Sequence, residues 1–207
     1  MNITNECNMK LMSRYEDNHF DLAIVDPPYG IERFKKCSEK DLETKSVHAK
    51  RFQKMGLVND IKPSKKYWDE LFRVSKNQII WGGNYFELPK TRGFLIWDKQ
   101  QPFPNFSACE YAWTSFNVPS KIFVQATTRT GEKKIHPTQK SVKLYEFCLH
   151  HLAKENDKIL DTHLGSGSIA IACHNLGYDL TACELDKEYY NAAMQRIERH
   201  KQQLTMF

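Results

Sequence analysis

A short apolar run that ends in Asp26-Pro27-Pro28-Tyr29 constrains this chain more than any other feature. Residues 22–25 are Leu-Ala-Ile-Val, a pattern typical of a buried strand. A strand that ends in aspartate places a carboxylate at the carboxyl edge of a sheet, where open α/β folds bind ligands. The two prolines fix φ and remove two N–H donors, which leaves a rigid turn lined by acceptors. Such a turn suits a planar molecule with an exocyclic amino group, although an ordinary Asp-Pro turn after a strand uses the same residues.

The rest of the chain alternates strand and helix patterns, which predicts an α/β fold with a doubly wound, mostly parallel sheet. We expect strands at 20–26, 78–81, 94–97, 111–116, 122–124, 158–161 and 180–184. We expect helices at 64–76, from Pro137 through Leu152, at 168–176 and at 187–201. At 207 residues, the chain has the size of a single domain, 1–207.

The excess positive charge is confined to one segment directly after the Asp-Pro-Pro-Tyr turn. The net charge is +5, and residues 31–66 hold eleven Lys/Arg against five Asp/Glu, whereas the remainder holds 19 against 20. We expect residues 31–60 to form a long basic loop, which is either a solvated surface or a contact for a polyanion. Its position beside the Asp-Pro-Pro-Tyr turn favours contact with nucleic acid, because neutralisation of phosphates supplies most of the non-specific affinity of proteins for nucleic acid. The candidate nucleic-acid contacts are Lys35, Lys36, Lys50, Arg51 and Lys54, with Arg129, Lys133 and Lys134 near Gly131.

Several protein classes are disfavoured by what the sequence lacks. No apolar run is long enough to span a membrane, and residues 1–6 are mostly polar, unlike a secretory signal. The six cysteines include no Cys-x-x-Cys pair, and the eight histidines show no metal-ligand spacing. We therefore expect a cytoplasmic protein with reduced cysteines, no membrane partner and no bound metal.

A second segment, residues 159–168, combines a strand, a glycine-rich turn and the start of a helix. Gly165 and Gly167 lie in a Gly-x-Gly-x-x-Ala pattern, and Glu184 follows Gly165 by nineteen residues at the end of the next expected strand. An acidic residue at about this spacing binds ribose hydroxyls in Rossmann-type sites. The segment therefore predicts a cofactor that contains adenosine. Asp161, just before the glycines, suits the cationic S-adenosylmethionine and would repel the pyrophosphate of NAD(P).

Together, the two segments resemble the β-class amino-methyltransferases of DNA, in which the Asp-Pro-Pro-Tyr segment precedes the cofactor segment in a circularly permuted order. The resemblance extends over nearly the full length. After the Asp-Pro-Pro-Tyr turn, the most specific match is His136-Pro137-Thr138-Gln139-Lys140. Further matches are Asn5-Glu6-Cys7, residues 79–86, residues 94–99 and residues 161–168, where Thr162 and His163 replace Pro-Phe and Ser168 replaces Thr.

The resemblance implies methyl transfer from S-adenosylmethionine to the N6 amino group of adenine in DNA. Asp26 and the carbonyl of Pro27, in a turn made rigid by Pro28, would accept the amino hydrogens. Tyr29 would stack on a base that has left the duplex. The implied cofactor contacts are Glu6 near adenine, Thr138 and Lys140 at the methionine end, and Asp161, Gly165, Ser166, Gly167, Ser168 and Glu184 around the turn.

Other functions remain as alternatives. Transfer to cytosine N4 or to an RNA base would use the same turn, although the cytosine enzymes of this kind more often have Ser in place of Asp26. A DNA-binding module could keep the fold without turnover, whereas a nicotinamide oxidoreductase would leave residues 26–29 and 136–140 unexplained. The candidate target-recognition region, 117–135, is short. Either sequence specificity is low, or residues 31–60 or a second subunit in a homodimer contribute to it.

Overall fold

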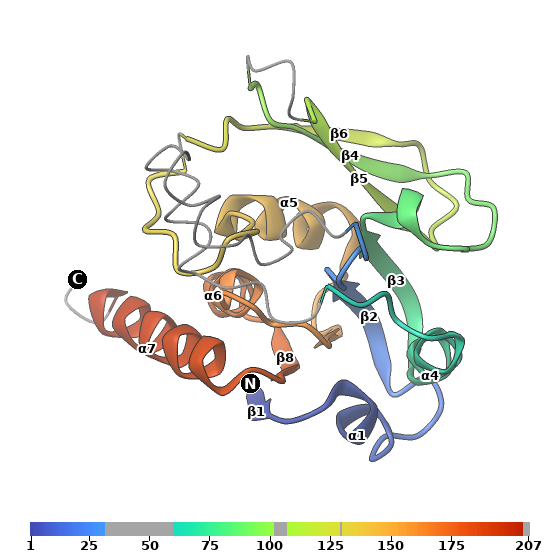
Figure 1. Cartoon of the computed structure of the whole chain (residues 1–207), viewed down its shortest axis with the longest axis horizontal. Helices are drawn as coiled ribbons and strands as arrows, with labels where there is room; N and C mark the ends of the chain where they lie inside the picture. The colour runs from blue at the N-terminus through green and yellow to red at the C-terminus, as the bar shows by residue number, and fades with distance from the viewer. Residues whose placement is uncertain (32–59, 102–106, 129, 205–207) are drawn as a thin grey trace, which may run out of the picture.

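The computed structural model describes residues 1–31, 60–101, 107–128 and 130–204. Within these ranges, one eight-stranded sheet in the order β1-β8-β7-β2-β3-β5-β4-β6 carries helices on both faces (Figure 1). The strands are β1 (Asn2–Asn5), β2 (Phe20–Val25), β3 (Ser75–Trp81), β4 (Phe94–Asp98), β5 (Cys109–Thr114), β6 (Lys121–Val124), β7 (Lys158–Asp161) and β8 (Asp179–Glu184). The helices are α1 (Asn8–Met12), α4 (Lys65–Val74), α5 (Val142–Leu152), α6 (Ser168–Leu176) and α7 (Lys187–Leu204), with a 3₁₀ turn η1 (Gly83–Tyr85).

The direction of winding changes in the middle of the sheet, between β2 and β7. From β2 the chain passes through α4 to β3 on one side, and from β7 it passes through α6 to β8 on the other. Right-handed crossovers in opposite directions place α4 and α6 on opposite faces. Most strand pairs are parallel, and β5 runs antiparallel to β3 and β4. The predicted doubly wound, mostly parallel sheet is confirmed, and such a change of direction is where open α/β sheets bind ligands.

Two apolar layers cover the sheet. One layer joins α5, α6 and α7 to one face and includes Trp81 and Leu149. The other joins α1 and α4 to the opposite face and includes Val25 and Leu71. Successive residues of β2 and β3 alternate between the layers because strand side chains point to opposite faces. A strand buried on both faces is apolar throughout, which explains the run at residues 22–25.

Helix α5 begins at Val142, whereas the sequence pattern predicted a start at Pro137. The Ser141 hydroxyl accepts the N–H of Leu144, and the Glu132 carboxylate accepts the N–H of Val142. These side chains satisfy donors that the first turn of a helix leaves unpaired. The residues before Ser141 therefore stay outside the helix, and the buried Lys140 side chain reaches the carboxyl edge of the sheet.

The sequence pattern predicted neither β1 nor α1. Strand β1 has four residues, is half-exposed and pairs in parallel with β8. Helix α1 has five residues and buries Leu11 and Met12. Elements this short carry too few residues for a period to be visible, so their structure depends on the neighbours that they pack against.

Three features of the described residues concern cysteines, metal ligands and apolar helices. The cysteines in these ranges are free thiols, and Cys148, Cys173 and Cys183 are buried. No group of three or more His, Cys, Asp or Glu in these ranges forms a candidate metal site. None of the helices described has the length and apolarity to cross a bilayer.

Candidate active site

The two segments singled out in the sequence meet at one edge of the sheet. Asp26 directly follows β2, and Asp161 ends β7. The two strands are parallel partners, with Leu22 opposite Ile159 and Ala23 opposite Leu160. Because paired strands lie about 4.8 Å apart, the Asp-Pro-Pro-Tyr turn and the glycine turn are neighbours.

The Asp26 carboxylate is held from two sides. The Tyr29 hydroxyl donates to Oδ1 at 2.6 Å, and the Lys140 ammonium donates to Oδ2 at 2.5 Å. The Asp26 side chain keeps 16% of its surface exposed, whereas Lys140 keeps 3%. The carboxylate is therefore the part of this pair that a ligand can reach.

Lys140 is the buried member of a chain of otherwise partly buried charges. Its Nζ lies 3.1 Å from Oε2 of Glu110, and the other carboxylate oxygen, Oε1, lies 2.5 Å from the Lys99 Nζ. Burial alone would raise the pKa of Glu110, but Lys140 and Lys99 lower it to about 2. Burial also opposes the charge of Lys140, yet Asp26 and Glu110 raise its pKa. The residues of this Asp26 network are Lys99, Glu110, Lys140, Asp26 and Tyr29.

The Tyr29 ring is fixed by an aromatic neighbour and a glycine. It stacks on Tyr85, with ring centres 4.9 Å apart and planes at 14°. Gly82 has φ +69°, and a Cβ at that position would overlap the Tyr29 ring. Only glycine fits there, because both the backbone conformation and the ring exclude a side chain. Burial raises the pKa of Tyr29 well above its usual value, so its hydroxyl stays a neutral donor.

The two glycines of the second segment differ in what surrounds them. Gly167 has φ +73°, and a Cβ there would lie 3.0 Å from Ile197 and 3.3 Å from Ala193, both on α7. Gly165 has φ +52°, and among the described residues a Cβ there would meet nothing closer than the His136 ring at 3.9 Å. Gly167 is therefore needed to pack α7, whereas the described residues leave space beside the Gly165 backbone, which a ligand can approach.

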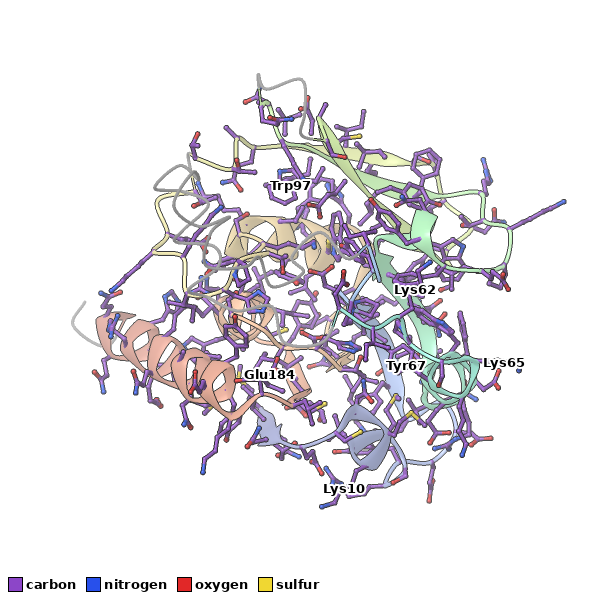
Figure 2. The ribbon with its side chains drawn as sticks, in the orientation of Figure 1. Lys10, Lys62, Lys65, Tyr67, Trp97 and Glu184 are labelled. Carbon is purple, nitrogen blue, oxygen red and sulfur yellow. The ribbon has the colours of Figure 1, made fainter. Side chains whose placement is uncertain are left out.

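The carboxylates near the glycine turn are held by backbone N–H groups. Glu184, at the end of β8 next to α7 (Figure 2), accepts from Gly165 at 2.8 Å and from Asp186 at 3.0 Å. Asp161 accepts the N–H of His163 at 2.9 Å. Burial raises the pKa of Glu184 and raises that of Asp161 to about 8. A buried carboxylate of this kind fits a cationic ligand group and disfavours a phosphate.

Thr162 and His163 form part of a chain of neutral hydrogen bonds. The Asn8 amide lies 3.2 Å from His163 Nε2, Thr162 Oγ1 lies 2.9 Å from His163 Nδ1, and the same hydroxyl lies 2.7 Å from the Tyr67 hydroxyl on α4 (Figure 2). Burial lowers the pKa of His163 to about 4. The imidazole is thus neutral and packs edge-on against Tyr67, as an apolar aromatic ring would.

The two serines of the turn are tied to α7. Arg196 donates to the Ser166 carbonyl at 2.8 Å and to the Ser168 hydroxyl at 2.9 Å. The same guanidinium binds Glu132 at 2.6 Å. Ser166 and Ser168 are buried and lie 3.1 Å apart, hydroxyl to hydroxyl. Arg196 therefore connects the glycine turn to the segment that precedes α5.

Glu6 and Thr138 lie near the site but have partners elsewhere. The Glu6 N–H donates to the Glu184 carbonyl at 3.1 Å. Its carboxylate is bound by both terminal nitrogens of Arg14, at 2.6 and 2.7 Å, which with Thr4 lower its pKa to about 2. Thr138 is exposed, and its hydroxyl lies 3.1 Å from His136 Nδ1.

Of the candidate DNA contacts, the structure describes Lys133 and Lys134, in the segment that leads to His136. Lys35, Lys36, Lys50, Arg51, Lys54 and Arg129 lie outside the described residues. The flanks of the basic segment meet at the site. The Gly30 N–H donates to Asp60 at 2.8 Å, and the Lys62 stem (Figure 2) packs against Gly30.

Sequence reasoning missed Glu110 and Tyr85 and assigned Lys140 to the methionine end of a cofactor. In the structure, the Lys140 ammonium reaches Asp26. Glu110 is the one acidic residue in the strand Cys109–Thr114. An acid in an otherwise apolar strand is a weak sign of an ion pair, because a charge that becomes buried needs a partner. No pattern in the sequence connected Tyr85 with Tyr29.

Part of the chain matches a known protein family, and known relatives cover most of its length. Residues 97–195 match the family described as DNA methylase. The type II methyltransferase M2.LlaDCHI of Lactococcus lactis subsp. cremoris is 24% identical, with 93% of this chain and 87% of that protein covered. M.HpaI of Haemophilus parainfluenzae is also 24% identical, with 92% and 72% covered. These sequence matches support an amino-methyltransferase.

Solved structures show the same fold. The complex of M1.HpyAVI with S-adenosylmethionine has a TM-score of 0.63 at 19% identity, covering 95% of this chain and 98% of that one. The cytosine-N4-specific PvuII DNA methyltransferase has a TM-score of 0.64 at 12% identity, covering 97% and 89%. The chain therefore has the Rossmann-like fold of S-adenosylmethionine-dependent methyltransferases.

Proposed function

We propose that this chain transfers a methyl group from S-adenosylmethionine to the N6 amino group of adenine in DNA, as a permuted β-class enzyme. The observation that carries the proposal is the position of Asp26 and the glycine turn at the ends of two paired strands, β2 and β7. One segment offers acceptors for an amino group, and the other offers room for an adenosine-containing donor. The family match and the type II relatives support methyl transfer to an exocyclic amino group of a DNA base, without distinguishing adenine from cytosine.

The glycine turn fits S-adenosylmethionine better than a dinucleotide. Glu184 would bind the ribose hydroxyls, Gly165 would let the ligand approach the backbone, and Asp161 would face a cationic group. Glu6, whose N–H meets the Glu184 carbonyl, would lie toward the adenine. When bound, the donor supplies a methyl group activated by a positively charged sulfur. The buried Asp161 argues against NAD(P), because pyrophosphate would add negative charge beside it.

Further contacts around the donor are proposed from the resemblance. Ser166, Gly167 and Ser168 would line the turn, with both serines held by Arg196. Thr138 and Lys140 would lie toward the methionine end of the donor. Lys140 also forms an ion pair with Asp26, which competes with a contact to the donor.

Asp26 would hold the amino group of the target base. An ionised carboxylate offers about four lone-pair positions, and Tyr29 and Lys140 use two of them. The remaining positions, with the Pro27 carbonyl, would accept amino hydrogens and turn the nitrogen lone pair toward the methyl group. Methyl transfer would form the nitrogen–carbon bond and break the carbon–sulfur bond of the donor, and the released amino proton would pass through the Asp26 carboxylate to solvent. Acceptors fixed in advance stabilise the positive charge that develops on nitrogen.

The base must leave the duplex to reach this edge, at a cost of a few kcal/mol. Tyr29 has one face on Tyr85, and the base would stack on its other face. Stacking of a base on an aromatic ring contributes roughly 1–3 kcal/mol, which offsets much of that cost.

The basic segment would bind the DNA backbone. Its flanks, Gly30 and Asp60, meet next to the Asp-Pro-Pro-Tyr turn, so DNA bound there would be close to Asp26. Sequence specificity would come from residues 117–135, which include β6, from the basic segment, or from a second subunit in a homodimer.

Cytosine N4 is the second candidate acceptor. It is also an exocyclic amino group, and a neighbour by fold is the cytosine-N4-specific PvuII enzyme. We favour adenine because the resemblance associates Asp26, rather than serine, with adenine enzymes.

The test is to incubate the protein with unmethylated plasmid DNA and S-adenosylmethionine that carries a labelled methyl group, followed by mass spectrometry of the nucleosides. N6-methyladenine is the expected product, and Asp26→Asn is the inactive control. N4-methylcytosine would support the second candidate. Label in RNA but not in DNA would identify an RNA enzyme. No label, with the donor bound in calorimetry, would leave a non-catalytic module.

A further inference from the structure

The Asp26 network contains a buried cation, Lys140, whose effect on Asp26 the proposed reaction leaves unassigned. Lys140 has 3% of its side chain exposed, and its Nζ donates to Asp26 at the carboxyl edge of the sheet. A buried ammonium is costly unless it is paired, so its position is set by its partners. Those partners are Asp26 and Glu110.

The geometry distinguishes the two partners of Lys140. Its Nζ donates to Asp26 at 2.5 Å, whereas the contact with Glu110 Oε2 is 3.1 Å. Glu110 Oε2 accepts no hydrogen bond from any described residue, so charge rather than a directed bond holds it near Lys140. Lys140 is therefore directed at Asp26, and Glu110 supports it from behind.

Glu110 is itself fixed by a second lysine. Lys99 Nζ lies 2.5 Å from Glu110 Oε1, and the Lys99 side chain is 16% exposed. The four charged side chains alternate in sign from Lys99 through Glu110 and Lys140 to Asp26, and their formal charges cancel. A neutral, alternating cluster can stay buried with each group in one position.

Lys140 uses only part of the Asp26 carboxylate. Oδ1 receives the Tyr29 hydroxyl and Oδ2 receives Lys140, which sets the plane of the carboxylate and leaves further lone pairs for a substrate. Without Lys140, the carboxylate could rotate about its own bond and lose this fixed plane.

We propose that Lys140 is a positioning residue that holds Asp26 in its acceptor orientation, and that Glu110, anchored by Lys99, holds Lys140 in place. This inference rests on the proposed function, in which Asp26 binds the amino group. It assigns Lys140 to the catalytic side of the site rather than to the cofactor.

The kinetic test uses Lys140→Met. We expect kcat to fall about 100-fold, the order of loss that a misplacement of about 1 Å produces, with the Kd for S-adenosylmethionine within about twofold of wild type. A Kd raised more than about tenfold, with kcat near wild type, would overturn the proposal in favour of a cofactor contact.

A double variant separates positioning from stability. Lys140→Met leaves the cluster with a net charge of −1, and we expect Tm to fall by roughly 5–15 °C. Adding Glu110→Gln returns the cluster to neutrality and should restore much of Tm, while kcat stays low. If turnover recovers together with Tm, the role of Lys140 is only structural and the proposal fails. Lys76→Met is the matched control, since it removes a lysine from Asp21 at the other end of β2 and should leave kcat unchanged.

Measurements of stability test the pairing of Lys140 with Asp26 independently of whether the protein is a methyltransferase. Unfolding of Lys140→Met, Asp26→Asn and the double variant forms a thermodynamic cycle, and we expect clear coupling between the two residues. Absence of coupling would overturn the inference even in an active enzyme. Coupling in a protein that methylates nothing would instead refute the proposed function and leave the Lys140–Asp26 pair standing.

Discussion

The carboxylates on the two sides of the site are held in opposite ways. In the Asp26 network, Asp26 and Glu110 have lysine partners, and the pKa of Glu110 is lowered to about 2. Around the glycine turn, Asp161 and Glu184 accept backbone N–H groups, and burial raises the pKa of both. The Asp26 carboxylate thus has a cationic partner within the protein, whereas Asp161 and Glu184 would ionise more easily once a cationic ligand bound beside them.

The largest effect is expected from removing the Asp26 carboxylate, which is paired with Lys140. Asp26→Ala should lower kcat by about 1,000-fold or more, since it removes an acceptor fixed in advance, while donor binding remains. Labelled methyl transfer and calorimetry measure the two quantities. Asp21→Asn is a matched control, because it removes a carboxylate from the opposite end of the same strand. Turnover near wild type in Asp26→Ala would refute its assigned role.

A glycine substitution tests whether the Tyr29 ring must occupy its observed position. Gly82→Ala should lower the free energy of unfolding by about 2–4 kcal/mol, from an unfavourable φ and from overlap with the ring. Gly177→Ala is the control, since it has φ +76° and nothing within 4 Å. It should cost about 1 kcal/mol, from φ alone. Equal losses in chemical denaturation would show that the ring moves aside without strain.

The stability of the protein should depend on pH through Asp161, which has no cationic partner among the described residues. The pKa of Asp161 is raised to about 8, so the folded protein keeps a proton that the unfolded chain releases. The free energy of unfolding should therefore fall as pH rises from about 5 to about 8, and donor affinity should rise over the same window, with proton release. Calorimetry in buffers of different ionisation enthalpy measures that release. Asp161→Asn should remove both trends, and their persistence in this variant would assign them to another group.

The smallest expected effect concerns DNA. Replacing Lys50, Arg51 and Lys54 with serine should weaken binding equally for all sequences and reduce the salt slope by about one unit for each phosphate that is no longer neutralised. Titrations at several salt concentrations measure the slope, and Lys65→Ser, in an exposed pair with Asp69, is the control. An unchanged slope would exclude the basic segment from the surface that binds DNA.

Much of the fold was predictable because its signals are local. Strand 158–161 and helix 168–176 have the predicted bounds, since apolar runs and glycines mark them. The start of helix α5 was predicted five residues too early, because proline is common at the first position of a helix and Pro137 was taken for it. The Glu132 carboxylate that caps Val142 lies ten residues before the helix, outside its periodic pattern. β1 and α1 were too short to give a period.

The departure from the family motif at His163 also shows that residue type alone does not predict how a side chain packs. In the sequence, His163 is a polar residue where the family has an aromatic one. In the structure, burial lowers its pKa to about 4, and Asn8 and Thr162 lie within hydrogen-bonding distance of its two nitrogens. Its neutral ring packs on Tyr67, so the substitution keeps an aromatic wall beside the turn.

Local patterns in the sequence identify which residues end the strands, and so which carboxylates and glycines lie at the carboxyl edge of the sheet. Strand period, turn chemistry and the order of elements are local properties, and they were enough to place Asp26 and Gly165 on the same edge. Long-range packing, which no local pattern describes, is what brings Lys140 to Asp26, 114 positions away, and places Glu110 and Lys99 behind it. A buried ion pair forms where packing removes water from both charges at once, and no local pattern encodes that coincidence.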